Sequence, residues 1–210
     1  MRNEKYETPQ EAFWAGDFGA GYIGRNEGAQ MIAANLNTFS HALKSARAGV
    51  KSALEIGANI GMNLKALQLL YPGIHLKAIE INSDAAIRLK TLIGESNVFE
   101  GSIIDYKDNE TVDLAFSRGV LIHINPEKLQ GVYELLYKSS KRYILLAEYY
   151  SPSPVSIIYR GHTDKLFKRD FAGEMLDKYP DLRLIDYGFV YHRDPVFPED
   201  DINWFLLEKK

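Results

Sequence analysis

The sequence of 210 residues predicts one α/β domain: a seven-stranded, mostly parallel sheet with helices on both faces and an antiparallel C-terminal hairpin. Short β-type runs alternate with helical patterns through the middle of the chain, which favours right-handed crossovers and a parallel sheet. After Pro180 two strand patterns are joined by a turn-rich segment with no helix, which favours an antiparallel pair. No repeat, low-complexity stretch or linker interrupts the chain, so we expect a single domain.

Seven strand patterns and three helical patterns can be placed in order along the chain. The strands are expected at residues 52–56, 75–81, 97–100, 112–117, 142–148, 182–191 and 203–208. The first helix covers residues 62–70, and the second has Ser83 as its N-cap and continues through Leu92. The third helix has Pro126 in its first turn and carries Leu129, Val132, Leu135 and Leu136.

Composition and charge favour a small-molecule partner over nucleic acid. Lysine and arginine number 25 against 28 acids, giving a net charge of -3 and no positive surplus for a phosphate backbone. The chain has no cysteine, which excludes disulfides and thiolate metal ligands, and we assign no residue to a metal site. No apolar stretch is long enough for a membrane helix, and Met1–Lys5 lacks the apolar segment of a signal peptide, so we expect a cytoplasmic protein.

The loop after the first strand reads E-I-G-A-N-I-G and opens the first helix, so its backbone N–H groups can face a ligand at the carboxyl edge of the sheet. Gly57 and Gly61 have no side chain, so they allow a ligand to approach the backbone of this loop closely. A nicotinamide fingerprint starting at Gly57 would need glycine in place of Asn59 and Met62. Glu55, directly before the turn, would oppose a pyrophosphate but suits a cationic amino group. The alternative is a plain glycine-rich turn.

Two further acids follow strands. Glu80 ends the second strand 23 residues after Gly57, close to the spacing at which an acid accepts hydrogen bonds from ribose hydroxyls. Asp105 follows the third strand, where it can meet an adenine amino group or serve as an N-cap or turn residue.

These residues together resemble the class I S-adenosylmethionine-dependent methyltransferases, over roughly residues 50–150 and, through the closing hairpin, to the C-terminus. The resemblance implies a Rossmann-like fold, methyltransferase activity and S-adenosylmethionine as cofactor. In that family the loop holds the methionine part of the cofactor. The acid at the end of the second strand binds the ribose, and the acid after the third strand binds the adenine. The matching positions here are Glu55, Gly57, Gly61, Glu80 and Asp105. Asn59 stands where the family commonly has glycine, and asparagine also visits positive φ.

Residues 116–124 resemble the segment of that family that faces the cofactor sulfur and the substrate. We assign Arg118 in this segment to cofactor binding. His123 is the candidate catalytic base for a hydroxyl or amine, because the ordinary pKa of histidine is near neutral. Equally, His123 can be a packed histidine that bonds to the backbone.

More narrowly, four segments resemble methyltransferases associated with pseudaminic acid biosynthesis: residues 13–26, 148–154, 159–162 and 168–171. This resemblance links the chain to nonulosonic acid sugars without fixing the acceptor atom. It covers the whole chain. Within the single domain we expect an N-terminal cover (1–48), a cofactor-binding core (49–150) and a substrate-side segment with the C-terminal hairpin (151–210).

The N-terminal stretch is too rich in glycine for a stable helix, so we expect an irregular cover over the cofactor. Tyr22 and Arg25 in this cover are expected to point inward, with Arg25 at the cofactor carboxylate. Aromatic residues are concentrated in the two flanks, where they either wall a pocket or pack as a second core.

The later flank supplies the residues assigned to the substrate: Tyr149, Tyr150, Arg160 and His162. Arg160 and His162 flank Gly161, and arginine forks suit an anionic acceptor. Lys165 and Lys168 follow nearby, although a solvated helix surface explains most of these charges too.

The function predicted is therefore methyl transfer to an oxygen or nitrogen of a small, anionic acceptor such as a nonulosonic acid or nucleotide sugar. One alternative is a non-catalytic domain that binds S-adenosylmethionine as a sensor or partner of a biosynthetic enzyme. A less favoured alternative is a nicotinamide oxidoreductase. The sequence does not distinguish O- from N-methylation and indicates neither a metal requirement nor an oligomeric state.

Overall fold

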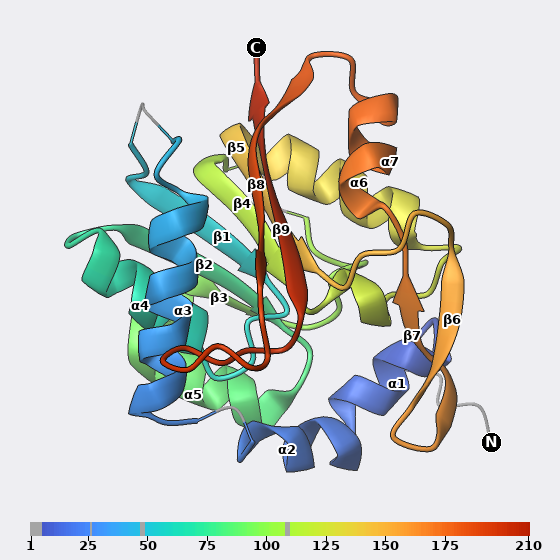
Figure 1. Ribbon diagram of the computed structural model, residues 1–210. Helices are drawn as coiled ribbons and strands as arrows, with labels where there is room; N and C mark the ends of the chain where they lie inside the picture. Colours follow the sequence, from blue (N-terminus) through green and yellow to red (C-terminus); the bar gives the residue numbers. More distant parts are fainter. Residues whose placement is uncertain (1–5, 26, 47–48, 108–109) are drawn as a thin grey trace.

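The computed structural model describes residues 6–25, 27–46, 49–107 and 110–210 (Figure 1). The expectations that rest on Met1–Lys5, on Asn26 and on the boundary at residue 48 lie outside the described residues. Within the described ranges, no helix has both the length and the apolar character to span a lipid bilayer.

Seven strands form one sheet in the order β3-β2-β1-β4-β5-β9-β8. They are β1 Ser52–Ile56, β2 His75–Glu80, β3 Val98–Glu100, β4 Val112–Arg118, β5 Ser140–Glu148, β8 Leu182–Val190 and β9 Ile202–Lys209. The first five pair in parallel, and β9 pairs antiparallel with both β5 and β8. The predicted fold class is confirmed, including the antiparallel C-terminal hairpin. Because β1 lies between β2 and β4, the loops that follow these three strands meet at one edge of the sheet.

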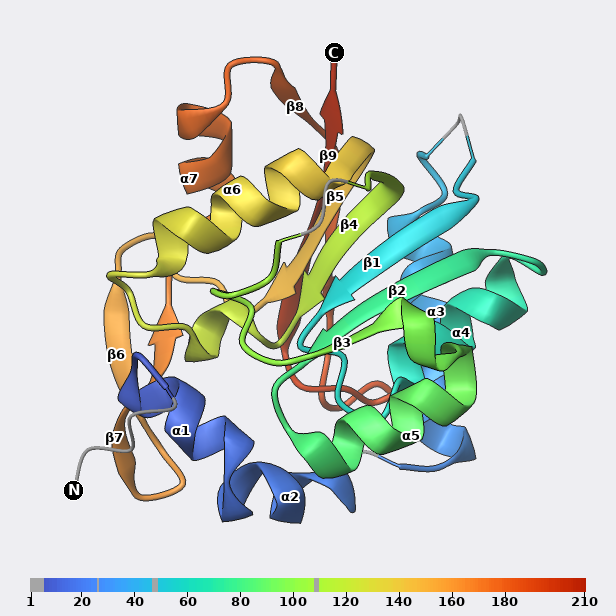
Figure 2. The same cartoon turned by 180° about the vertical axis from the view of Figure 1, so that it is seen from behind.

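Helices cover both faces of this sheet (Figures 1 and 2). One face carries α3 (Ala29–Ala42), α4 (Met62–Leu70) and α5 (Ser83–Ile93), and the other carries α6 (Leu129–Ser139) and α7 (Phe171–Lys178). Two 3-10 helices, η1 (Glu95–Asn97) and η2 (Leu121–His123), follow α5 and β4. The remaining elements lie beyond the carboxyl ends of the parallel strands: α1 (Pro9–Ala15), α2 (Asp17–Ile23), β6 (Val155–Tyr159) and β7 (His162–Lys168).

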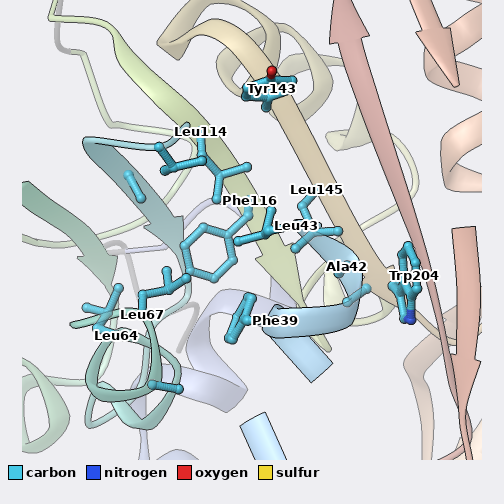
Figure 3. Packing of buried hydrophobic residues seen from close by; sticks show 14 of the residues in the cluster. Phe39, Ala42, Leu43, Leu64, Leu67, Leu114, Phe116, Tyr143, Leu145 and Trp204 are labelled. Carbon is cyan, nitrogen blue, oxygen red and sulfur yellow. The ribbon is translucent and has the colours of Figure 1, made fainter. Parts of the chain in front are cut away.

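The core between α3, α4 and the sheet fixes the position of β4 (Figure 3). Phe39 of α3 meets Phe116 of β4 edge to face, with ring centroids 5.5 Å apart. Leu64 and Leu67 of α4 are fully buried in the same cluster. Burying side chains of this size contributes about 1.5–3 kcal/mol each, so α3, α4 and β4 are held as one unit. The residues at the end of β4 are thereby held close to the start of α4.

The start of α5 differs from the prediction by one residue. The helix begins at Ser83, and its N-cap is Asn82, whose side-chain oxygen accepts a hydrogen bond from the N–H of Ala85 at 3.2 Å. Asparagine and serine are almost equally good N-caps, so two adjacent candidates are hard to separate by sequence.

The start of α6 also differs. The helix begins at Leu129, and Pro126 lies in the turn before it. The side chain of Asn125 accepts a hydrogen bond from the N–H of Glu127 at 2.9 Å, and such a local bond favours a turn over a helix.

The glycine-rich N-terminal segment is helical, so the prediction of an irregular cover is wrong at α2. A Cβ atom on Gly19 would lie 1.8 Å from the carbonyl oxygen of Trp14, which means that α2 approaches α1 at a distance only glycine allows. Glycine costs a helix about 1 kcal/mol relative to alanine. The close packing of α1 and α2 offsets that cost.

The segment with clustered cations forms the β6–β7 hairpin, so its alternative assignment to a solvated helix is wrong. Tyr159 pairs with His162 across a two-residue turn. Arg160 and Gly161 in this turn have φ values of 49° and 83°, as the mirror-image turns of tight hairpins require.

Candidate functional site

The loop between β1 and α4 has the backbone conformation that its sequence predicts. Gly57 has a φ of 66°, and a Cβ atom there would lie 2.7 Å from a methyl group of Val120. Asn59 takes a φ of 49°, the positive value expected of an asparagine in place of glycine. Gly61 has a φ of 82° and lies against Leu89 and Leu92 of α5. Larger residues at either glycine would push the loop away from its neighbours.

The amides of this loop mostly bond within the protein, in contrast to the prediction that they face a ligand. The N–H groups of Gly57 and Ala58 donate to the carbonyl oxygen of Ile79 at 2.8 and 3.1 Å. The N–H of Asn59 donates to Glu80 Oε2 at 2.7 Å. Ligand recognition at this loop therefore depends on side chains.

Glu55, at the end of β1, is 1% exposed and has one unused oxygen. Its Oε1 accepts a hydrogen bond from Asn63 Nδ2 at 2.6 Å, whereas Oε2 has no partner among the described residues. Burial raises the pKa of Glu55 to about 8, against the opposing effects of Asn63 and Arg118. A buried oxygen without a donor costs free energy, so this site favours a cationic N–H group from a ligand.

Arg118, at the end of β4, is held from three sides. One terminal nitrogen donates to Asn35 Oδ1 at 2.5 Å and to Asn63 Oδ1 at 2.8 Å, and the other pairs with Glu199 Oε2 at 2.5 Å. Its Nε is buried and has no acceptor in the part of the chain that the structure describes. Since Asn63 bonds to both Arg118 and Glu55, an unused cationic donor and an unused carboxylate oxygen belong to one network.

Glu80, at the end of β2, is buried and bonds to two backbone amides. Its Oε2 accepts from Asn59 and its Oε1 from Asn82, each at 2.7 Å. Burial raises the pKa of Glu80, and these bonds oppose that shift. Glu80 therefore ties the glycine loop to the start of α5, and a carboxylate retains lone pairs for further donors.

Asp105 and Ser102 lie in the segment after β3, and only Ser102 is buried. Asp105 is exposed, and its N–H donates to the Ser102 carbonyl at 3.1 Å. The hydroxyl of Ser102 donates to Glu11 Oε1 at 2.5 Å, which ties α1 to this loop. Glu11 also completes a capping box with Thr8.

His123, in η2, is 8% exposed and has a fixed tautomer. Its Nδ1 lies 2.5 Å from the carbonyl oxygen of Lys165, so Nδ1 carries the proton and Nε2 carries the lone pair. Burial lowers the pKa of His123 to about 4, so the ring is neutral at neutral pH. The packed histidine bonded to backbone is therefore observed, and the role of His123 as a catalytic base through Nε2 stays a prediction.

Aromatic rings from α1 and β6 lie against His123. Trp14 lies 4.6 Å from its ring and Tyr159 lies 5.1 Å from it, measured between centroids. Tyr22 lies beside Trp14 at 5.3 Å. Arg25, by contrast, is exposed at the end of α2, so its predicted inward orientation is not observed.

The four residues assigned to the substrate differ in burial. Tyr149 is partly buried, bonds to Asp200 and has a pKa raised by burial and by that carboxylate. Tyr150 is 41% exposed and lies near Phe205. Arg160 and His162 are exposed on the hairpin: Arg160 lies over the Tyr159 ring at 5.6 Å and His162 lies 4.9 Å from the Phe13 ring.

Several residues of the site were missed by sequence reasoning: Trp14, Asn35, Asn63, Glu148 and Glu199. Asn63 lies next to the recognised loop and could have been found from its place in the first turn of the following helix. The rest depend on contacts between distant segments. Glu148 accepts hydrogen bonds from the hydroxyl of Ser117 and from three amides at the start of η2, and it positions His123 through that turn.

Two further features of the surface lie away from this network. A cavity of about 360 Å³ is lined by Val50, Lys51 and residues 70–74, at the amino ends of β1 and β2. The described residues include no cluster of three histidines or acids that could hold a metal ion.

With this geometry, the chain has the fold of the class I S-adenosylmethionine-dependent methyltransferases. A 1,6-didemethyltoxoflavin-N1-methyltransferase from Burkholderia thailandensis, solved with 1,6-didemethyltoxoflavin and S-adenosylhomocysteine, matches 98% of this chain and 92% of its own. The TM-score is 0.68 at 18% identity. A magnesium protoporphyrin IX methyltransferase from Synechocystis PCC 6803, solved with S-adenosylhomocysteine, matches 95% of this chain and 98% of its own, with a TM-score of 0.67 at 12% identity.

A third solved structure, an S-adenosylmethionine-dependent methyltransferase from Archaeoglobus fulgidus, matches 92% of this chain and all of its own, with a TM-score of 0.63 at 16% identity. No family model matches the chain, and no curated protein matches it by sequence. The narrower resemblance to methyltransferases of pseudaminic acid biosynthesis therefore stays a prediction.

Proposed function

We propose that this protein transfers the methyl group of S-adenosylmethionine to a small, anionic acceptor. The observation that carries the proposal is the pair of buried, unused atoms Glu55 Oε2 and Arg118 Nε at the carboxyl edge of a methyltransferase fold. One atom needs a donor and the other an acceptor. The amino and carboxylate groups of an amino acid satisfy both, and the methionine part of S-adenosylmethionine carries them.

The residues present fit this cofactor. Glu55 receives the ammonium group and Arg118 the carboxylate, while Gly57 and Gly61 let the loop pack closely against Val120 and α5. Glu80 receives the ribose hydroxyls with the lone pairs that its two backbone bonds leave. The further assigned positions are Asn59, which shapes the loop, Asp105 at the adenine amino group, and Tyr22 in the cover.

When bound, the cofactor supplies a methyl group on a positively charged sulfur. The contribution of this chain is to place the acceptor in line with that methyl group and to exclude water. Trp14 and Tyr159 pack against the ring of His123, Tyr22 lies beside Trp14, and the His123 ring is thereby shielded from water. His123 Nε2 takes the proton that the acceptor loses.

We further propose that the acceptor is an acidic sugar, such as a nonulosonic acid or a nucleotide sugar. The cationic side chains of the β6–β7 hairpin support an anion, with Arg160 and His162 nearest to the turn. Tyr149 and Tyr150 connect the end of β5 to this hairpin and complete the proposed acceptor side.

Calorimetry and mass spectrometry test the proposal in sequence. S-adenosylmethionine or S-adenosylhomocysteine should bind, and NAD should not; tight NAD binding without heat from either sulfur nucleoside would refute the cofactor. Methyl transfer is then screened across sugar acids, nucleotide sugars and amines. Binding of the cofactor with no transfer to any acceptor in the cell's metabolite extract would favour the sensor or partner alternative.

A further inference from the structure

Trp14 and His123 form a pair of rings between α1 and η2. Their centroids are 4.6 Å apart and their planes meet at 54°. The two residues come from segments more than 100 positions apart. Both rings lie near Tyr159, 6.5 and 5.1 Å from its centroid, and Tyr159 belongs to the β6–β7 hairpin proposed for the acceptor.

The two rings carry complementary hydrogen-bonding atoms. The indole N–H of Trp14 is shielded from solvent and has no acceptor within the described ranges. His123 uses its Nδ1–H on the carbonyl of Lys165, so its remaining ring nitrogen, Nε2, is an acceptor. Two neighbouring rings thus carry an unused donor and an acceptor, and a ligand group that both accepts and donates can satisfy the two together.

We propose that this pair binds a hydroxyl group of the acceptor molecule and that the protein is accordingly an O-methyltransferase. The inference rests on the proposed function. A hydroxyl oxygen has two lone pairs, so it can accept the hydrogen bond of Trp14 with one and attack the methyl group with the other. A neutral amine has one lone pair, which the indole would occupy, and an ammonium group has none.

The step balances without a further reactant. The second lone pair of the hydroxyl oxygen forms the new O–C bond while the C–S bond breaks and its electrons stay on sulfur. The hydroxyl proton moves to His123 Nε2, and the imidazolium later releases it to water. Because the hydroxyl becomes strongly acidic as the O–C bond forms, a neutral buried imidazole is a sufficient base.

The first test needs no knowledge of the acceptor. The chain has two tryptophans, Trp14 and Trp204, so the ¹⁵N-labelled full chain loaded with S-adenosylhomocysteine shows two indole N–H resonances, which Trp14→Phe assigns. The probes are ethylene glycol and ethylenediammonium, which have equal length. We expect glycol to shift the Trp14 resonance saturably, leaving Trp204 in place, and the diammonium to shift neither. A Trp14 resonance that glycol leaves unmoved, or that both probes shift alike, overturns the proposal.

The second test follows the product. With [methyl-¹³C]S-adenosylmethionine and the acceptor found by the screen, the label should appear as an O-methyl group. Trp14→Phe keeps an aromatic ring but removes the N–H, so turnover should fall at least tenfold while the Kd for S-adenosylhomocysteine changes less than twofold. Phe13→Leu removes a ring beside Trp14 but keeps the indole, so turnover should fall much less in this variant. An N-methyl product overturns this inference and leaves the proposed methyl transfer standing, whereas failure of the cofactor to bind refutes both.

Discussion

Arg118 and Glu199 form an ion pair of 2.5 Å between the end of β4 and the β8–β9 loop, with side chains only 12% and 6% exposed. Glu199 also accepts a hydrogen bond from the hydroxyl of Thr38 on α3 at 2.9 Å. The loop is thereby fastened over the arginine whose Nε is assigned to the cofactor carboxylate. Glu199 holds the guanidinium in place and is a positioning residue for it.

Glu199→Gln should therefore weaken binding of the cofactor's amino-acid part selectively. The variant can still accept from Thr38 but leaves the shielded charge of Arg118 without its counter-charge, and breaking such a pair costs about 3–5 kcal/mol when it is fully buried. We expect a lower Tm and at least fivefold weaker binding of S-adenosylhomocysteine by calorimetry. Binding of 5′-methylthioadenosine, which lacks the amino-acid part, should change less than twofold. Equal losses for both ligands would show that the loop matters only for overall folding.

Cofactor affinity should rise with pH through Glu55. The pKa of Glu55 is raised to about 8, so the free protein must release a proton before this carboxylate can receive an ammonium group. Between pH 6 and 7 an α-amino group is still charged, and affinity should increase about tenfold per pH unit. Calorimetry of S-adenosylhomocysteine in buffers with different ionisation enthalpies measures the proton released.

Two controls accompany this measurement. Glu55→Gln should bind more weakly and lose the pH dependence, and 5′-methylthioadenosine should show no such dependence with the unaltered protein. The role given to Glu55 is wrong if Glu55→Gln retains the pH slope.

His123 should make the folded state less stable as the pH falls from about 6.5 to about 4. The unfolded chain binds a proton at its ordinary pKa near 6.5, whereas burial lowers the pKa in the folded state to about 4. The unfolded state therefore holds more protons in this window, and the lost stability is on the order of 3 kcal/mol. The raised pKa values of Glu55 and Glu148 act in the opposite direction.

The measurement is thus a difference. The free energy of unfolding in urea is measured for the unaltered protein and for His123→Gln at pH 7, 6, 5 and 4.5. As the pH is lowered, the unaltered protein should lose stability relative to the variant. A difference that stays constant would mean that the His123 ring is not shielded as the structure has it.

Arg160 and His162 should affect acceptor use and leave cofactor affinity nearly unchanged. Both are exposed on the hairpin and lie outside the cofactor loops. Because Arg160 has a positive φ, Arg160→Asn tests its charge with less strain on the turn than Arg160→Ala. Arg160→Lys should retain little acceptor turnover if the guanidinium binds an anion through two parallel hydrogen bonds, because lysine cannot form that pair.

Acceptor turnover and the Kd for S-adenosylhomocysteine are measured on the same variants, with Thr163→Ala on the same strand as control. If turnover is unchanged in Arg160→Asn and His162→Ala, the hairpin does not bind the acceptor and has only a structural role. A collapse of cofactor binding would instead make the hairpin a cover for the cofactor.

The parts of the fold that the sequence predicted best are those with local signals. The β1 strand and α4 helix were predicted with their observed bounds, because an apolar run, a glycine turn and a helical leucine pattern follow one another there. The capping box of Thr8 and Glu11, with Pro9 at the first position of α1, is an equally local signal that was overlooked.

The remaining differences depend on contacts between distant segments. Gly19 is helical because α2 packs against the Trp14 carbonyl, which no local propensity reveals. The glycine loop and its acids could be identified by spacing, but the bonds of Glu199 to Arg118 and Thr38 join residues more than 80 positions apart. Patterns along the chain predict which residues end strands, and tertiary packing decides which of them meet.

The place of β9 has a consequence for how the molecule folds. It is the last strand in the sequence, yet it lies between β5 and β8, with Tyr143 opposite Glu208 in the register. This pairing gives the C-terminal half a high contact order, and such non-local pairing slows folding. The parallel strands and their cofactor loops can assemble first, while β8 can join them only through β9. Trp204 is buried at this junction, so its fluorescence emission should follow the insertion of the final strand separately from events around Trp14.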